Sequence, residues 1–248
     1  KSAVGETRFW EDLAEAMAPR DRGVDFITID GGEGGTGAGP LVFSDAVSLP
    51  FRLGFPRVYT IFAAAGLTDD VVFIGSGKLG IPENAVVAFA MGVDMINVGR
   101  EAMLSIGCIQ AQKCHTGGCP TGIATQNQWL TRGVDPTSMA ERCANYLRAL
   151  RRELIKVSGA VGVPHPAMIT PNDVELAHGT RTSTTLAEVY GYEDDWGVPS
   201  DADIAAITDI MIENGIAEYS AASLPPGVKP RAASGSTTQP GTDADAAT

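Results

Sequence analysis

Three cysteines within twelve residues are the part of this sequence whose types and spacing point most clearly to chemistry. Cys108, Cys114 and Cys119 are separated by five and by four residues, and Pro120 follows the last of them. Thiolates are soft ligands that suit iron–sulfur clusters and zinc. Three thiolates match a cluster with three iron corners, and a proline after the last ligand is found in ferredoxin-type loops. The spacing therefore indicates an iron–sulfur cluster.

Two other interpretations of these cysteines stay open at this level. Zinc could be bound by the three thiolates and His115, although ligands at the adjacent positions 114 and 115 fit one tetrahedron poorly, and structural zinc sites usually have shorter spacings. The thiols could also be unrelated side chains in a polar loop. The fourth cysteine, Cys143, falls on the apolar stripe of a predicted helix, so we expect it to pack in the core.

Loops that contain glycine follow three successive apolar segments. They span 31–39, 75–78 and 99–100, and the last two end in Lys78 and Arg100. Glycine lets backbone N–H groups approach an anion closely, and the N-terminus of a following helix favours negative charge. The loops therefore indicate a phosphorylated cofactor, with the two cations on its phosphate. Alternatively, the glycines only permit tight turns between strand and helix.

Single polar residues give weaker indications. Glu33, inside the first loop, could reach a ligand or could be a solvated carboxylate. Lys1 is of interest only if it ends a strand. His165 and His178 lie in a loop and near a helix end, without convincing catalytic partners.

The elements that must position these loops alternate between strands and helices. Apolar runs predict strands over 24–29, 71–74 and 95–98, with a possible fourth at or just before Lys1, and helical spacing predicts helices over 9–17, 58–65 and 82–91. Strands that are apolar on both faces and separated by single helices are typical of a parallel sheet covered by helices. The fold class is therefore α/β. Three strands alone leave open edges, which indicates the latter part of something larger.

The second half of the sequence is mainly helical. A polar loop over 105–127 carries the cysteines, and a long helix follows, with Asp135 as N-cap, Pro136 in its first position and Gly159 at its end. A short helix is predicted from Thr170 to Gly179, and a further helix is capped by Ser200 and Asp203. We expect three parts: 1–130, a helical extension over 131–223, and a disordered tail over 224–248, where apolar bulk is nearly absent.

Composition excludes several kinds of partner. The chain has 248 residues, 44% of them apolar, and a net charge of −12. This acidic balance argues against nucleic acid, which is bound by basic surfaces. No stretch approaches the roughly 20 apolar residues of a membrane span, and no signal peptide is visible. Few cysteines and no leader make a reducing cytoplasm the expected location.

These residues together resemble the FMN-binding synthase domain of the glutamate synthase large subunit, in the stand-alone type. The resemblance covers about residues 1 to 160. It is carried by the stretches 24–38, 73–78, 99–100 and 108–126, the last being the cysteine loop with its His after the second Cys and Pro after the third.

The resemblance implies a (β/α)8 TIM barrel, of which this chain would hold strands six to eight and the tip of strand five, followed by the cluster loop and the helical extension. It implies FMN beside a [3Fe–4S] cluster, and reductive amination of 2-oxoglutarate to L-glutamate through 2-iminoglutarate. The implied partners are an ammonia source and an electron donor, either a reductase subunit or ferredoxin. The residues that match the family are Cys108, Cys114 and Cys119 for the cluster, Gly34, Gly35, Thr36, Gly37, Gly75, Ser76, Gly77, Lys78, Gly99 and Arg100 for FMN, and Lys1 near the flavin and the keto acid.

The sequence departs from the large enzymes of this family. The first half of the barrel, an amidotransferase domain and a glycine-rich β-helix are not in the chain, so we expect the chain alone not to be a competent enzyme. Two alternatives remain: an enzyme similar to N-methylglutamate synthase, which uses methylamine, and an iron–sulfur electron-transfer module with a vestigial flavin site.

Overall fold

The computed structural model describes residues 1–33, 42 and 47–213, and its main element is a parallel sheet of four strands in chain order. The strands are β1 (Ser2–Ala3), β2 (Phe26–Asp30), β3 (Val72–Ser76) and β4 (Met95–Asn97). Helices α1 (Arg8–Met17), α2 (Phe51–Ala64) and α3 (Pro82–Ala90) connect consecutive strands. The predicted α/β class with a parallel sheet is confirmed. The fourth strand is present, and it begins one residue after Lys1.

The register places the carboxyl ends of the strands at one edge. Asp30 pairs with Ser76, and Ser76 pairs with Asn97, so the last residues of β2, β3 and β4 stand side by side. Ala3, the last residue of β1, pairs with Asp30. Because all four strands are parallel, every loop that follows a strand starts at this carboxyl edge.

One face of the sheet packs against the connecting helices and forms the core. Ile27 and Ile29 of β2 and Phe73 of β3 are buried, and Phe55 and Phe62 of α2 contact Phe73 edge-on. Trp10, Ala14 and Met17 form the buried stripe of α1, as their helical spacing predicts.

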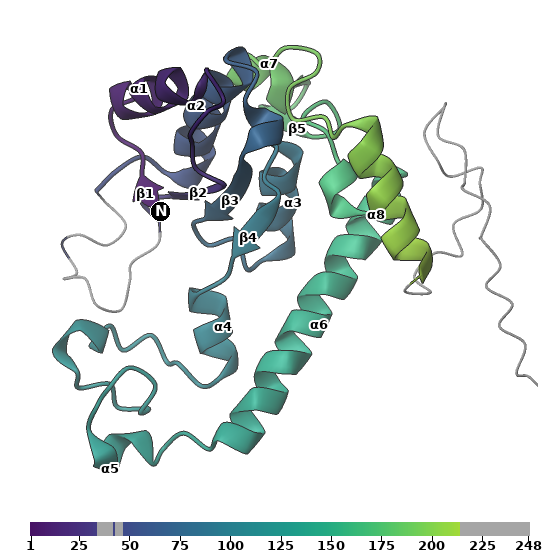
Figure 1. Ribbon diagram of the computed structural model, residues 1–248. Helices are drawn as coiled ribbons and strands as arrows, with labels where there is room; N and C mark the ends of the chain where they lie inside the picture. The colour runs from purple at the N-terminus through teal and green to yellow at the C-terminus, as the bar shows by residue number, and fades with distance from the viewer. Residues whose placement is uncertain (34–41, 43–46, 214–248) are drawn as a thin grey trace, which may run out of the picture.

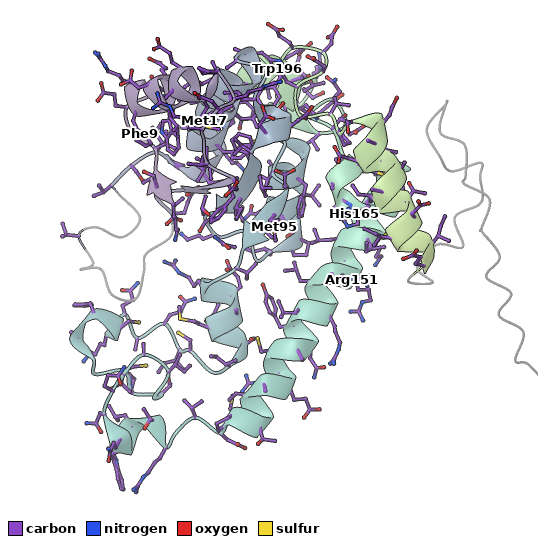
Figure 2. The ribbon with its side chains drawn as sticks, in the orientation of Figure 1. Phe9, Met17, Met95, Arg151, His165 and Trp196 are labelled. Atoms are coloured by element: carbon purple, nitrogen blue, oxygen red, sulfur yellow. The ribbon has the colours of Figure 1, made fainter. Side chains whose placement is uncertain are left out.

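The opposite face carries exposed apolar side chains. Phe26 is 59% exposed, its register partner Val72 is 41% exposed, and Met95 is 57% exposed. Met95 is labelled on β4 in Figure 2. Along the same strands the face becomes polar toward the carboxyl edge, where Asp30, Ser76 and Asn97 lie. We call this surface the open face.

The remaining elements first extend away from the carboxyl edge, and the chain then returns to the helices that cover the sheet. They are α4 (Arg100–Ser105), the short 3-10 helix η3 (Cys114–Thr116), α5 (Gln128–Thr131), α6 (Pro136–Val161), η4 (Pro166–Met168), a hairpin of β5 (Glu175–His178) and β6 (Thr182–Thr185), α7 (Leu186–Tyr190) and α8 (Asp201–Glu213). Figure 1 shows α4 and the cysteine loop beyond the strand ends, and the long α6 running back past α4 and α3. A further 3-10 helix, η2 (Thr68–Asp70), precedes β3.

Several predicted helix ends are confirmed and two are wrong. Asp135 caps α6 by accepting the N–H of Thr137, and Ser200 accepts the N–H of Asp203 at the start of α8. The long helix does not end at Gly159. It continues to Val161 and ends at Gly162, whose φ of 103° is the left-handed conformation that a helix C-terminus favours. The helix predicted over 58–65 begins seven residues earlier, at Phe51, and includes Pro56.

The helix predicted from Thr170 to Gly179 is also wrong, because this segment forms a turn and the first strand of the hairpin. Asp173 accepts hydrogen bonds from the N–H and hydroxyl of Thr170, which closes a tight turn before β5. Gly179 lies in the hairpin turn with φ of 71°. The β-branched residues of β6 favour the extended partner strand. The predicted extension over 131–223 is therefore not wholly helical, and the predicted tail over 224–248 lies outside the described residues.

Within the described part of the chain, no helix has the length and apolar content needed to cross a membrane.

We expect Tyr59→Phe to weaken the attachment of the segment around Gly197 to the core between the sheet and its helices. The Tyr59 hydroxyl accepts the buried N–H of Gly197 at 3.0 Å, and burial raises the pKa of Tyr59 to about 12, so the phenol stays neutral. Removing the acceptor leaves the N–H unpaired, which costs about 1–3 kcal/mol. Chemical denaturation measures this loss. Tyr190→Phe is the matched control, because the Tyr190 hydroxyl makes no hydrogen bond within the described residues. Equal stability of the two variants would contradict the prediction.

We expect the 248-residue chain, expressed alone, to self-associate through the open face. Phe26, Val72 and Met95 expose apolar side chains on one face of the sheet, and water disfavours such a surface. Light scattering after size-exclusion chromatography should give a mass above that of one chain, and Phe26→Ser with Met95→Ser should lower it. A monodisperse monomer at micromolar concentration would contradict this expectation.

Candidate functional site

The loops after β2 and β3 are held together at the carboxyl edge. The Gly31 N–H donates to the carbonyl of Ser76 at 2.7 Å, which continues the strand pairing by one residue into the loops. The structure therefore brings the predicted segment 75–78 beside the start of the glycine loop. Gly34, Gly35, Thr36 and Gly37 of that loop lie outside the described residues.

Glu33 has a structural partner that the sequence did not reveal. Its carboxylate accepts the N–H of Phe51 at 2.8 and 2.9 Å, and so caps the first turn of α2. Glu33 and Phe51 also line a cavity of about 220 Å³ between α2 and α3, to which Gly77 and Lys78 contribute. A carboxylate at a helix N-terminus is favoured by the unpaired N–H groups there.

The glycines of β3 and its loop are required by packing. A Cβ on Gly75 would lie 2.9 Å from the ring of Phe51, and a Cβ on Gly77 would lie 2.9 Å from the Phe51 Cβ. The interpretation that these glycines permit tight turns is therefore supported at both positions. Gly99 differs, because a Cβ there would meet no atom within 4 Å.

Lys78 and Arg100 lie at the same edge, on neighbouring strand ends. Lys78 adopts a left-handed φ of 54°, and the Asn84 amide donates to its carbonyl at 2.9 Å, which fixes this turn to the start of α3. Arg100 is the first residue of α4, directly after Gly99. Both side chains are half-buried. Two cations at one edge can bind a phosphate by charge-assisted hydrogen bonds.

Lys1 contacts the carboxyl edge from the other side of β2. Its ammonium lies 2.8 Å from the carboxylate of Asp30, the last residue of β2. Asp30 and Asn97 are not among the site residues predicted from the sequence. A polar residue at the last position of an otherwise apolar strand is the sequence pattern that would have predicted Asp30 and Asn97.

The three cysteines lie in the loop beyond α4. Cys108 follows α4 and its sulfur accepts the N–H of Gln110 at 3.4 Å, Cys114 begins η3, and Cys119 is buried. A hydrogen bond with the Thr121 hydroxyl, helped by backbone N–H groups of Ala124, Thr121 and Ile123, lowers the pKa of Cys119 to about 7. All four cysteines are free thiols.

The donor chemistry of this loop fits an iron–sulfur cluster, but the thiols are not assembled around one point. N–H groups directed at thiolate sulfur are a known influence on such clusters. Among the residues that the structure describes, no three His, Cys, Asp or Glu side chains are grouped so that they could hold one metal ion. His115 is exposed. Cys143 lies on α6 and is half-buried, so the expectation that it packs in the core is met only in part.

His165 lies on the α6 side of the molecule, next to Arg151, as Figure 2 shows. Its Nδ1 accepts the N–H of Ala167 at 3.2 Å. Burial, together with the charge of Arg151, lowers the pKa of His165. Within the described residues, the His165 side chain serves the turn into η4.

Comparison with known proteins places most of the chain in one family. The model of the conserved region in glutamate synthase matches residues 10–164. The glutamate synthase large subunit-like protein YerD of Bacillus subtilis is 37% identical over 166 residues, which are 67% of this chain and 32% of that relative. The archaeal glutamate synthase [NADPH] of Methanocaldococcus jannaschii is 35% identical over 68% of this chain and 31% of that relative.

A ferredoxin-dependent glutamate synthase of Cyanidium caldarium is 33% identical over 59% of the chain, but this covers 9% of the algal protein. The chain thus spans about a third of the length of YerD and the archaeal relative. The matched region contains β2, β3 and β4, their loops and all three clustered cysteines. By this match, the chain belongs to the glutamate synthase family.

Proposed function

We propose that the protein containing this chain is an oxidoreductase of the glutamate synthase type, which reductively aminates 2-oxoglutarate to L-glutamate through 2-iminoglutarate. One observation carries the proposal. The region that matches the family holds both the cationic carboxyl edge and the cysteine loop directly after it. The electron source differs among relatives, since the archaeal one is named for NADPH and the algal one for ferredoxin.

FMN and a [3Fe–4S] cluster are the cofactors that this proposal requires, and when bound they would supply hydride chemistry and single-electron delivery. Gly75, Ser76, Gly77 and Lys78, with Gly99 and Arg100, would hold the FMN phosphate. The open space beside Gly99 leaves room for a ligand to approach the backbone there. Cys108, Cys114 and Cys119 would bind the cluster, and this requires the loop to bring their sulfurs together.

The open face supports the further proposal that β1 to β4 are the tip of strand five and strands six to eight of a TIM barrel. In a barrel, this face would point inward, and its exposed apolar side chains would be covered by the first four strands. Active sites of such barrels lie at the carboxyl ends of the strands, which is where Lys1, Lys78 and Arg100 are found.

A second candidate, an electron-transfer module without flavin, is favoured by one observation. Gly75 and Gly77 are already explained by their contact with Phe51, so they do not require a phosphate. Flavin and iron content of the complete protein separate the two candidates. We expect stoichiometric FMN, bound iron, and glutamate formation that depends on 2-oxoglutarate and an ammonia source. A cluster without flavin and without this turnover would identify the module, and methylamine as the preferred nitrogen donor would identify an N-methylglutamate synthase.

Lys78→Ala and Arg100→Ala in the complete protein should each weaken FMN binding by about tenfold or more, since a charge-assisted hydrogen bond contributes about 1.5–3 kcal/mol. Fluorescence titration of the flavin measures the affinity, and the cluster absorption should be retained. Lys156→Ala, an exposed cation on α6, is the matched control. Unchanged affinity in both variants would show that the phosphate is held by backbone groups or lies elsewhere.

Serine in place of Cys108, Cys114 or Cys119 should remove the cluster, because a hydroxyl is a harder and weaker ligand for iron than a thiolate. Iron analysis and electron paramagnetic resonance of the oxidised protein measure the loss. Cys143→Ala should leave the iron content unchanged and cost about 1 kcal/mol of stability through a small cavity. Zinc in place of iron, or loss of the cluster signal in the Cys143 variant, would overturn the assignment.

A further inference from the structure

The ion pair between Lys1 and Asp30 directs the lysine toward the carboxyl edge. Lys1 precedes Ser2, and Ser2 pairs with Ile29 of β2. The Lys1 ammonium nevertheless lies 2.8 Å from Asp30, which follows Ile29 along β2. The side chain therefore leans along the strand direction, toward the loops that follow β2 and β3. Without its partner, a lysine with four rotatable side-chain bonds would not be held in this orientation.

Asp30 and Lys1 lie on the open face. Side chains alternate between the two faces of a strand, so Lys1 and Ala3 share one face of β1, and Asp30, which pairs with Ala3, lies on the same face of β2. The neighbouring Ile29 is fully buried on the helix-covered face. The ion pair thus belongs to the surface that we assign to the barrel interior.

Asp30 is also the first member of a polar row. Its register partner is Ser76, and the partner of Ser76 is Asn97. The next level toward the amino ends contains Thr28, Ile74 and Met95, and the level below it contains Phe26 and Val72. Thr28 is the one polar residue among these five, and it is buried. In β2, β3 and β4 the open face therefore becomes wholly polar only at the level of Asp30, and the Lys1 ammonium lies at this level.

Within this chain, the ion pair is too exposed to contribute much to stability. The Lys1 side chain is 50% exposed and that of Asp30 is 25% exposed. Ion pairs with this much solvent contact contribute little to folding. An ammonium has three donors, and among the described residues the carboxylate oxygen of Asp30 engages one of them, which leaves donors for an anionic ligand.

We propose that Asp30 is a positioning residue, whose carboxylate holds the Lys1 ammonium at the carboxyl edge in the orientation that binds the keto acid. This inference rests on the proposed function, in which Lys1 contacts 2-oxoglutarate. Asp30 itself does not touch the substrate, because a carboxylate would repel the two carboxylates of 2-oxoglutarate. Its effect is transmitted through Lys1 alone.

The test uses the complete protein with four variants: Asp30→Asn, Asp30→Glu, Lys1→Met and the double variant Asp30→Asn with Lys1→Met. Binding of 2-oxoglutarate is followed by perturbation of the oxidised flavin spectrum, which needs no turnover, and KM and kcat are measured separately. Asp70→Asn is the matched control, since it removes another exposed ion pair, with Arg20 at 3.0 Å, at the amino end of β3.

Asp30→Asn should weaken 2-oxoglutarate binding by about tenfold, the size expected for one charge-assisted hydrogen bond, and should raise KM more than it lowers kcat. Asp30→Glu should restore part of the affinity. In the Lys1→Met background, Asp30→Asn should have no further effect, because a residue that acts through Lys1 has nothing left to position. The FMN content and thermal stability of all variants should match those of Asp70→Asn.

An equal loss from Asp30→Asn with and without Lys1, or unchanged affinity in Asp30→Asn, would overturn the inference while leaving the proposed function intact. Wild-type protein that contains FMN but does not bind 2-oxoglutarate would overturn the proposed function, and this inference with it.

Discussion

Parallel pairing in register between β2, β3 and β4 is the constraint on which the candidate site depends. Asp30, Ser76 and Asn97 end their strands at the same level, so the loops that follow them start from one edge. A shift of one residue in either pairing would turn the side chains of that strand to the other face. The cations at 78 and 100 are 22 positions apart in sequence and become neighbours along the edge only through this register.

Phe51 packs against the residues that form the carboxyl edge. Its backbone N–H is bound by Glu33, its ring and Cβ fill the space that side chains at Gly75 and Gly77 would need, and it begins the helix that covers β2 and β3. The first residues after β2 (31–33), the loop after β3 and the start of α2 thus all contact one residue. A ligand at this edge would meet a rigid surface, and rigid elements hold binding groups more accurately than free loops do.

The two faces of the sheet differ in burial. The helix-covered face is a closed core, with aromatic contacts among Phe55, Phe62 and Phe73. The open face exposes Phe26, Val72 and Met95, and its polar row at the edge includes the ion pair between Lys1 and Asp30. In the cysteine loop, backbone N–H groups are directed at the sulfurs of Cys108 and Cys119.

The sequence by itself determined the α/β class, the three long strands, the helices α1 and α3, both N-caps at Asp135 and Ser200, and the resemblance that the family match confirmed. These follow from local rules, since periodicity, β-branching and capping act over a few residues. The tertiary structure decided the rest. Glu33 is a helix cap because Phe51, 18 residues later, folds back onto it, and Asp30 pairs with Lys1 because β1 and β2 are adjacent. The segment after Thr170 forms a hairpin with β6, a partner that no local pattern identified. Each of these features depends on residues that are distant in sequence and meet only in the folded chain. The spacing of neighbouring residues does not predict such contacts.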